Sequence, residues 1–188
     1  MSIDDRPMAR ERLMNELREH ALVLEPVVLT SGRTSQYLID AKRAILRPAG
    51  FAALATLVAG QADDWGATAV GGMTMGADPI ACAALAGGAA VKAFFVCKEV
   101  KQHGLARRIE GPQLEATDRC MIVEDVVTTG GSTIQALEAV RAEGHEICGV
   151  LAICDRLAGG AQAIEQAARA PFLALSTIDE IYPDRPDR

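Results

Sequence analysis

The chain has 188 residues, of which 49% are hydrophobic and only 4% aromatic, and its formal net charge is −6. This length is enough for one well-buried core, and the scarcity of aromatic residues favours a core of Ala, Val, Leu and Ile, as in parallel sheets covered by helices. The acidic balance, with a pI near 5.1, argues against a general nucleic-acid-binding surface.

The N-terminal part is predicted to form a small appendage ahead of the core. Its first residues, MSIDDRPMARER, are too charged for a signal peptide, and the sequence has no run of about 18 uncharged apolar residues. We therefore expect a cytoplasmic protein that binds no membrane. Residues 8–21 have the spacing of an amphipathic helix, and extended segments follow at 27–29 and 37–39. Together these pieces predict an N-terminal hood over residues 1–45.

From residue 48 onward, helices and strands are predicted to alternate. The predicted elements are a helix at 48–59, a strand with a glycine turn at 67–72, a helix at 75–88, a strand at 91–97, a strand at 120–125, a helix at 132–144, a strand at 145–155, a helix at 160–170 and a strand at 171–175. Such alternation predicts an α/β fold with a doubly wound, mostly parallel sheet flanked by helices and joined by right-handed crossovers. We expect a single domain over residues 1–188.

The five cysteines form no CxxC pair and are odd in number, which favours free thiols in a reducing compartment. Three of them, Cys120, Cys148 and Cys154, lie in apolar strand-like runs. We expect these three to be small core residues.

The most informative segment is CMIVEDVVTTGGST, residues 120–133. A predicted buried strand ends there at two adjacent carboxylates, Glu124 and Asp125, and a hydroxyl- and glycine-rich loop leads into a helix. Ligands of open α/β sheets bind beyond the carboxyl ends of the strands, and glycine amides, hydroxyls and a helix N-terminus together favour a phosphate. The predicted phosphate cradle consists of Thr128, Thr129, Gly130, Gly131 and Ser132.

The paired carboxylates need a different ligand, because acids beside a phosphate would repel it unless they face hydroxyls or a divalent metal ion. A ribose 5-phosphate supplies a phosphate at one end and hydroxyls a few ångströms away. The alternative is an ordinary turn between strand and helix. Such a turn needs Gly or Asn, but it has no use for an acidic pair at the strand end.

The segment between the strands at 91–97 and 120–125 is unusually long and basic. Connections in α/β units are normally about 2–6 residues, whereas residues 98–112 form a far longer one, which is typical of functional loops. Its Lys98, Lys101 and His103 could neutralise a highly charged leaving group when the loop closes and excludes water. On composition alone, a solvated surface loop is the alternative.

Two further sites are weaker when taken singly. GGMTMGADPIA, residues 71–81, follows a strand and opens a helix, so its amides could bind a second phosphate. Arg156 follows the strand at 145–155 and could pair with a carboxylate, although a surface charge pair with Asp155 is the default interpretation.

The 120–133 segment resembles the phosphoribosyl-pyrophosphate (PRPP) motif of the type I phosphoribosyltransferases. The resemblance covers roughly Val27 to Arg156 and is strongest with the orotate phosphoribosyltransferase family. It implies that Glu124 and Asp125 hold the ribose hydroxyls and that residues 128–132 hold the 5-phosphate. It also implies that Asp125 is catalytic.

The long basic loop is similar to the family's RKEAKxHG motif, which reads CKEVKQHG in this chain. The family's loop residues act on pyrophosphate, which assigns PRPP binding to Lys98, Lys101 and His103. Lys101 matches the loop lysine closest to catalysis. The chain departs from the family at Cys97, where arginine is usual, and this removes one expected pyrophosphate contact.

Residues 27–43, VVLTSGRTSQYLIDAKR, are similar to the base-binding segment LxSGxxSxYxxx of the family. Many members have an orotate-contacting lysine where this chain has Thr30, and Lys42 or Arg43 could replace it. SGRTS alone would be read equally well as a polar turn. The resemblance further implies that Thr128 and Arg156 bind orotate.

The resemblance implies an enzyme of pyrimidine (UMP) biosynthesis that converts orotate and PRPP into orotidine 5′-phosphate and pyrophosphate. It implies Mg²⁺ as cofactor, held through PRPP rather than by assigned protein ligands, and a homodimer with shared active sites. Two alternatives stay open. A phosphoribosyltransferase for another base, such as a purine, would keep the cradle, and a non-enzymatic PRPP-sensing regulator would need a nucleic-acid surface and no loop lysine.

Overall fold

The computed structural model describes residues 5–28, 34–98 and 108–188. The helices are α1 (Arg6–Glu16), the π-helix η2 (Leu17–Ala21), α2 (Lys42–Ile45), α3 (Pro48–Asp64), α4 (Asp78–Ala86), α5 (Gly131–Ala142), α6 (Gly160–Ala168) and α7 (Ile178–Ile181). The strands are β1 (Leu22–Val23), β2 (Val27–Val28), β3 (Thr34–Ser35), β4 (Leu38–Ile39), β5 (Ala69–Met73), β6 (Lys92–Val96), β7 (Ile109–Glu110), β8 (Arg119–Val127), β9 (Glu146–Asp155) and β10 (Phe172–Thr177).

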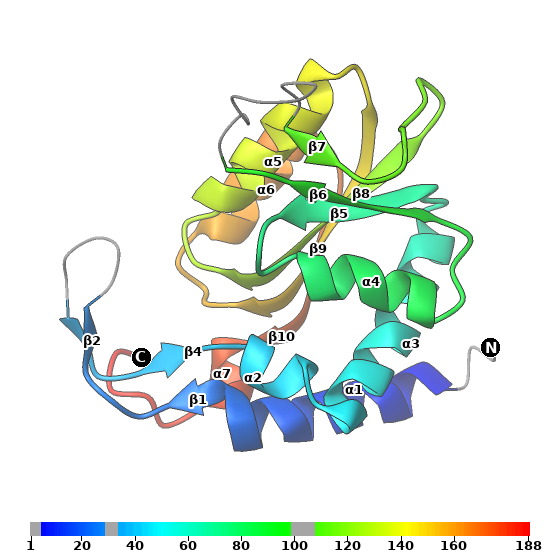
Figure 1. The fold of residues 1–188 in the computed structure, drawn as a ribbon. Helices are drawn as coiled ribbons and strands as arrows, with labels where there is room; N and C mark the ends of the chain where they lie inside the picture. Colours follow the sequence, from blue (N-terminus) through cyan, green and yellow to red (C-terminus); the bar gives the residue numbers. More distant parts are fainter. Residues whose placement is uncertain (1–4, 29–33, 99–107) are drawn as a thin grey trace.

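A six-stranded sheet with the order β10-β9-β8-β5-β6-β7 forms the centre of the molecule (Figure 1). Its first five strands in this order are parallel, and β7 pairs with β6 in the antiparallel direction. The predicted mostly parallel α/β fold is thus confirmed. The chain builds the sheet outward in two directions from the β5–β8 pair, and ligands of doubly wound sheets bind at the carboxyl ends of the strands at such a switch point.

Helices cover both faces of the sheet, so its central strands are apolar on both sides. Along β8, Met121 and Val123 belong to a buried cluster shared with α1, α3 and α4, whereas Cys120 and Ile122 belong to a second cluster shared with α5 and α6. Successive side chains of a strand point to opposite faces, which explains why this strand reads as an unbroken apolar run.

The predicted core cysteines are confirmed: Cys120, Cys148 and Cys154 are buried, and all five cysteines are free thiols. In the described residues, no helix combines the length and the hydropathy needed to cross a membrane.

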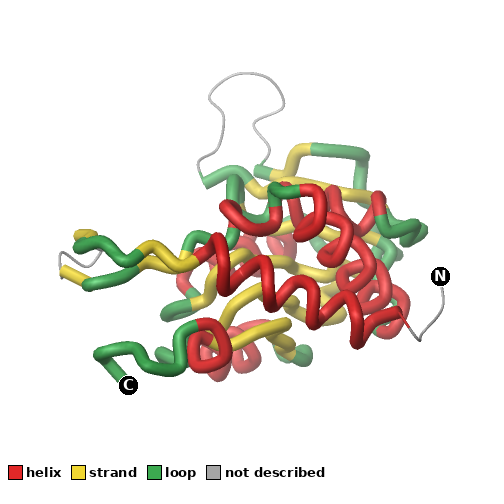
Figure 2. Tube along the Cα trace, turned by 90° about the horizontal axis from the view of Figure 1, so that it is seen from below, coloured by secondary structure: helices red, strands yellow, loops and turns green. Residues whose placement is uncertain are grey.

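The first part of the chain lies outside the six-stranded sheet. It contains α1, the π-helix, α2 and two small antiparallel pairs, β1 with β4 and β2 with β3. Both views show the small strands projecting to one side of the helical layer, with the end of the described chain on that same side (Figures 1 and 2). Leu13, Leu17 and Tyr37 join the cluster that also holds α3. We use the term hood for residues 5–28 and 34–47.

Several predicted boundaries are wrong: the helix predicted at 75–88 extends only over Asp78–Ala86, and three further cases have a clear physical reason. The helix α3 continues to Asp64 rather than ending at residue 59, because Ala62 is buried and Asp64 pairs with Arg6 of α1. Gly71 and Gly72 form no turn but lie inside β5, between two strands that approach closely. A Cβ atom on Gly71 would lie 2.3 Å from the carbonyl oxygen of Phe94 in β6.

The third correction concerns β8, which does not end at the acidic pair but continues to Val127. Its pairing with β9 extends from Glu124↔Ala152 to Val127↔Asp155, so the backbone around the two carboxylates is held in the sheet. The acidic side chains therefore stand on a rigid strand rather than on a loop.

The described chain ends with α7 and a segment over residues 182–188 that the sequence pattern does not predict. Thr177 and Glu180 form a capping box at the start of α7, and Glu180 also pairs with Arg10 of α1. The side chains of Arg185 and Asp179 form an ion pair that holds the 182–188 segment to α7. The Tyr37 hydroxyl donates to Oδ1 of Asp187 at 2.9 Å, and this contact joins the end of the segment to the hood.

Candidate active site

The first element of the candidate site is Glu124, near the carboxyl end of β8. Its carboxylate is almost completely buried and accepts hydrogen bonds from the hydroxyls of Ser132 at 2.7 Å and Thr133 at 3.0 Å, both in the first turn of α5. Burial raises the pKa of Glu124 to about 7; the Ser132 and Thr133 hydroxyls oppose the rise, and the neighbouring Asp125 adds to it. Glu124 can therefore gain or lose a proton near neutral pH.

The second element is Asp125, whose Oδ2 atom accepts a hydrogen bond from Lys42 Nζ at 3.0 Å. The same ammonium lies 2.8 Å from Oδ1 of Asp40. Lys42 begins α2, so this contact joins the hood to the end of β8. Burial acts to lower the pKa of Lys42, but the two carboxylates outweigh it and the pKa is raised. The ammonium thus stays charged and neutralises part of the acidic pair.

The third element is the predicted cradle between β8 and α5. Gly130 adopts a left-handed conformation with φ 84° at the start of α5, which a residue with a side chain rarely adopts. Gly160 N donates to the carbonyl of Thr128 at 3.1 Å, and a Cβ atom on Gly160 would lie 2.5 Å from that oxygen. The first turn of α6 therefore fixes the cradle. Gly131 begins α5, and Thr128, Thr129 and Ser132 flank the turn.

The loop between β5 and α4 meets the same edge of the sheet. A Cβ atom on Gly76 would lie 2.5 Å from Oδ1 of Asp125, so the backbone of this loop passes directly against the acidic pair. The Thr74–Met75 peptide bond is cis. Asp78 begins α4, and burial raises the pKa of its carboxyl. The predicted second phosphate position thus lies beside Asp125, with an acidic residue in the first turn of its helix.

The fourth element is Arg156, which directly follows β9. Its backbone N–H donates to the carbonyl of Val127 at 2.8 Å, so it stands beside the end of β8. Its guanidinium donates from Nη2 to the hydroxyl of Tyr37 at 2.9 Å and lies over the Tyr37 ring, 4.8 Å from its centroid. Asp187 Oδ2 lies 3.9 Å from the same Nη2 atom. Arg156 is therefore held by the hood and by the 182–188 segment.

The structure brings most, but not all, of the predicted site residues together. Glu124, Asp125, the cradle residues 128–132 and Arg156 meet at the carboxyl ends of β8 and β9. Lys98 lies exposed just after β6. The predictions for Lys101, His103 and Thr30 fall outside the described residues. Of the predicted 98–112 loop, residues 109–110 form β7 and return along β6.

Sequence reasoning missed two residues of this region, Tyr37 and Asp187. Tyr37 is almost fully buried although it lies in a short polar segment, and Asp187 is far away in the sequence. Tyr37 matches the tyrosine of the base-binding motif LxSGxxSxYxxx, and that match was the signal that could have singled it out. No periodicity or spacing signal points to Asp187, because its contact depends on the path of the chain after α7.

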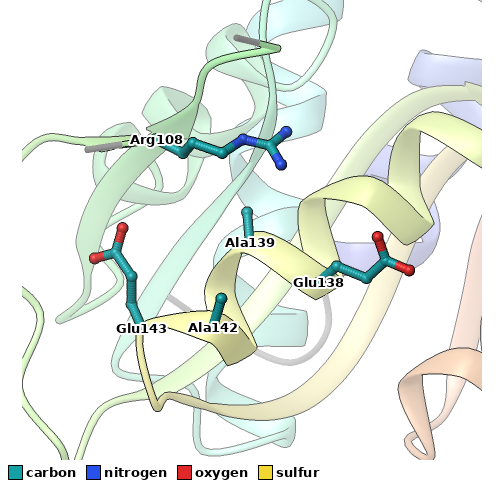
Figure 3. A pocket seen from close by; sticks show the side chains of 5 residues that line it. All are labelled: Arg108, Glu138, Ala139, Ala142 and Glu143. Atoms are coloured by element: carbon teal, nitrogen blue, oxygen red, sulfur yellow. The ribbon is translucent and has the colours of Figure 1, made fainter. Parts of the chain in front are cut away.

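A hollow of about 330 Å³ is lined by Arg108, Glu138, Ala139, Ala142 and Glu143 (Figure 3). It lies against the second half of α5, whereas the cradle precedes the first turn of that helix. Arg108 Nε donates to the carbonyl of Cys97 at 3.2 Å, which ties the return strand to the end of β6. The two glutamates would repel a phosphate, so we place the candidate site at the cradle and not in this hollow.

No protein-family model matches the chain. The orotate phosphoribosyltransferase of Streptomyces avermitilis is 40% identical over 176 residues, which cover 92% of this chain and 96% of that protein. The crystal structure of Mycobacterium tuberculosis H37Rv orotate phosphoribosyltransferase in complex with Fe(III) dicitrate superposes with a TM-score of 0.82 at 35% identity, covering 93% of this chain and 99% of that one.

A second structure of the M. tuberculosis enzyme, in complex with PRPP, superposes with a TM-score of 0.78 at 33% identity and covers 92% of this chain and 98% of that chain. Similarity in both sequence and fold therefore extends over nearly the whole length of the compared proteins.

Proposed function

This chain belongs to the orotate phosphoribosyltransferase family, and from that premise we propose which of its residues carry the reaction. The enzyme transfers the 5-phosphoribosyl group of PRPP to orotate and releases orotidine 5′-phosphate and pyrophosphate, a reaction of pyrimidine biosynthesis. The bond between ribose C1 and the pyrophosphate oxygen breaks, and its electron pair leaves with pyrophosphate. A ring nitrogen of orotate donates the pair that forms the new bond.

The observation that carries the site assignment is the rigid placement of Glu124 and Asp125 beside a helix-capping glycine turn. Both carboxylates can accept hydrogen bonds from the ribose hydroxyls, and residues 128–132 can bind the 5-phosphate with backbone N–H groups at the start of α5. Because the pKa of Glu124 is near 7, this acid can be neutral as the charged substrate approaches and ionise when the hydroxyls bind. The adjacent acids then do not exclude the phosphates.

Catalysis in this arrangement depends on positioning and electrostatics rather than on a covalent enzyme intermediate. As C1 loses its leaving group, the ribose becomes positively charged, and the carboxylate of Asp125 stabilises that charge through the hydroxyls. Lys98, with Lys101 and His103 beyond the described residues, would bind the departing pyrophosphate. Lys101 would be the loop residue closest to the breaking bond.

A magnesium ion fits this site chemically, because Glu124 and Asp125 offer the hard oxygen atoms that Mg²⁺ prefers. We propose that PRPP supplies most of its ligands and that the acidic pair faces it through the ribose hydroxyls. When bound, the ion would offset the negative charge of the pyrophosphate.

Base recognition is assigned to Arg156 and Thr128, which lie beyond the ends of β9 and β8. A guanidinium can bind a carboxylate with two parallel hydrogen bonds, and orotate differs from uracil by one carboxylate. We therefore expect Arg156→Ala to raise the Michaelis constant for orotate far more than that for PRPP. Equal losses for both substrates would instead place Arg156 in the phosphate site.

Substrate choice is tested by one spectrophotometric assay. Orotate consumption with PRPP and Mg²⁺ is compared with the consumption of adenine, hypoxanthine and uracil at equal concentrations. We expect turnover with orotate and none with the other three bases. Turnover of a purine would favour the other-base alternative, and PRPP binding without turnover of any base would favour a regulator.

We further propose a homodimer in which the loop around Lys101 closes over the PRPP of the other subunit. Two-fold dimers are the commonest oligomers of globular proteins, and residues 98–112 exceed what a local connection needs. Mixing Lys101→Ala with Asp125→Asn subunits would then give dimers with one intact site, and about a quarter of normal activity should return. No recovery after confirmed subunit exchange would place Lys101 in its own chain's site.

A cytoplasmic location is also proposed, supported by the five free thiols.

A further inference from the structure

The contacts around Tyr37 form a chain of hydrogen bonds that starts at the proposed base-binding arginine. Arg156 Nη2 donates to the Tyr37 hydroxyl oxygen at 2.9 Å. That hydroxyl in turn donates toward the Asp187 carboxylate, whose Oδ1 and Oδ2 atoms lie 2.9 and 3.0 Å away. Arg156 itself is 3.9 Å from Asp187, beyond hydrogen-bond distance. Of Tyr37 and Arg156, only the tyrosine therefore donates directly to this carboxylate.

The surroundings of Tyr37 hold this donor in one orientation. The residue is 2% exposed, its ring meets Tyr182 edge to face with centroids 5.3 Å apart, and the Arg156 guanidinium lies over its face. Burial, together with the nearby Asp187 carboxylate, raises the pKa of the hydroxyl, so it keeps its proton. A donor that also accepts a hydrogen bond from a cation is polarised and binds an anion more strongly.

Asp187 differs from Tyr37 and Arg156 in its exposure to solvent. Its side chain is 55% exposed, whereas that of Arg156 is 12% exposed. Besides Tyr37 and Arg156, it lies 3.2 Å from Arg185 Nε within its own segment. An exposed carboxylate on a peripheral segment can leave at little cost. The buried tyrosine and the partly buried arginine would then have an anion-binding position to fill.

We propose that Tyr37 and Arg156 together form the carboxylate-binding position for the base, and that Asp187 occupies this position until orotate displaces it. The inference rests on the proposed role of Arg156 and adds two residues to it: Tyr37 as a specificity-determining donor and Asp187 as an internal competitor. The side chain of an aspartate carries the same functional group as the substituent that distinguishes orotate from uracil. The Asp187 carboxylate thus makes with Tyr37 the contact that we propose for the carboxylate of orotate.

An internal competitor reduces apparent affinity by the fraction of molecules in which the position is free. Asp187→Asn keeps the size of the side chain and removes its charge, so the Michaelis constant for orotate should fall about two- to fivefold. Asp184→Asn is the matched control. Asp184 lies in the same segment, and the described structure gives it no hydrogen bond to Tyr37 or Arg156, so this variant should behave as the parent.

Tyr37→Phe keeps both ring contacts and removes only the hydroxyl. Loss of a hydrogen bond to a charged group should raise the Michaelis constant for orotate about 10- to 100-fold, with smaller changes in kcat and in the Michaelis constant for PRPP. When Tyr37→Phe and Asp187→Asn are combined, Asp187→Asn should no longer lower the Michaelis constant for orotate, because the Tyr37 hydroxyl that Asp187 contacts is absent. Thermal unfolding of each variant checks that the fold is intact.

The outcomes separate this inference from the proposal on which it rests. If Arg156→Ala leaves the Michaelis constant for orotate unchanged, the assignment of Arg156 itself fails. If Arg156→Ala raises it but a folded Tyr37→Phe variant stays within twofold of the parent, Tyr37 is no binding residue. If Asp187→Asn and Asp184→Asn give the same constant as the parent, Asp187 does not compete with the substrate.

Discussion

Two buried carboxylates at opposite ends of the same strand show how differently one fold can treat the same chemical group. Asp118 directly precedes β8 and is 6% exposed, and Glu124 lies near the end of β8 and is 5% exposed. Burial alone would raise the pKa of both. Yet the pKa of Asp118 is lowered to about 2, while that of Glu124 is raised to about 7.

The difference lies in the partners. Asp118 accepts hydrogen bonds from the backbone N–H of Glu115 at 2.7 Å, from the Lys92 ammonium at 2.8 Å and from the Thr68 hydroxyl at 2.7 Å. These donors, one of them a full positive charge, outweigh burial. Glu124 accepts hydrogen bonds from the Ser132 and Thr133 hydroxyls and a longer one, at 3.3 Å, from the backbone N–H of Asp125. None of these donors is charged, and a second carboxylate stands beside it. Asp118, before the amino end of the strand, thus has a full set of hydrogen-bond partners within the protein. Glu124, near the carboxyl end, can still bind a ligand.

This contrast agrees with the general arrangement of parallel sheets, in which function gathers at the carboxyl ends of strands. An acid whose hydrogen bonds are all satisfied by its own protein stabilises the fold and has no capacity for a ligand. An acid with an incomplete set of partners costs stability and gains the capacity to bind. The following substitutions test whether the acid before β8 contributes to stability and the acids near the end of β8 contribute to activity.

The largest effect is expected for Asp125→Asn at the reactive end. The carboxylate is proposed to stabilise developing positive charge on the ribose, and loss of one such electrostatic contact typically costs about 10²–10³ in rate. Steady-state turnover and thermal unfolding are measured together. Turnover should fall by this factor with little change in Tm, and near-normal turnover would remove Asp125 from the catalytic role.

At the satisfied end, Asp118→Asn should lower stability while the folded enzyme keeps its turnover. Breaking the pair removes the nearest charged partner of Lys92 and leaves its ammonium the more distant Glu115, at 3.9 Å, so the Tm of the variant should lie below that of the parent at pH 7. Because the folded pKa is depressed, the stabilisation is present above the unfolded pKa near 4 and is lost as pH falls toward about 2. Melting curves at pH 7 and pH 3 should therefore show a smaller difference between variant and parent at pH 3. An equal difference at both values would mean that the charge of Asp118 does not matter.

Glu124→Gln should change the free energy of unfolding in the opposite direction, towards higher stability. The folded pKa of Glu124 is raised, so the folded state retains a proton that the unfolded chain releases above about pH 4.5, and stability declines as pH rises toward about 7. A neutral amide removes this cost, and the variant should be more stable than the parent by about 1–2 kcal/mol at pH 8. The gain should shrink at pH 5. Denaturant titrations at the two pH values measure both quantities, and destabilisation at pH 8 would contradict the assignment of a charged, poorly compensated Glu124.

The smallest effect is expected for Ser132→Ala. Its hydroxyl donates to Glu124 at 2.7 Å and lowers the pKa of that acid, so its removal should raise the pKa further by about half a unit to one unit. The pH profile of kcat/KM for PRPP reports this change as a shift of its acidic limb to higher pH. Ser132→Thr, which keeps the hydroxyl, should leave the limb in place. A uniform loss of activity without a shift would assign Ser132 to the phosphate alone.

Much of the central sheet was predictable because its strands are buried on both faces. A strand such as β8 or β9 then appears as an unbroken apolar run, and the helices between them have a clear apolar stripe. The boundaries were less predictable. Gly71 and Gly72 carry the signature of a turn, but they lie inside β5, where neighbouring backbone atoms leave no room for a side chain. Local composition does not contain that information.

The candidate site shows the same division. The order of acids, hydroxyls and glycines in residues 120–133 was enough to predict a phosphate cradle, because these groups act through their local backbone. The partners of the acids were not predictable. Lys42 reaches Asp125 from 83 positions away, and Asp187 reaches Tyr37 from 150 positions away.

The sequence by itself therefore determined the main strands of the central sheet with the helices that cover them, the two-faced burial of those strands and the position of the cradle, since each follows from the periodicity and chemistry of neighbouring residues. Only the tertiary structure decided which charges meet. Lys92 is brought to Asp118, Lys42 to Asp125 and Arg156 to Tyr37 by the way the chain folds back on itself. Whether a buried acid stabilises the fold or stays free to bind depends on those distant partners, because the energy of a buried charge is set by the charges and donors within a few ångströms.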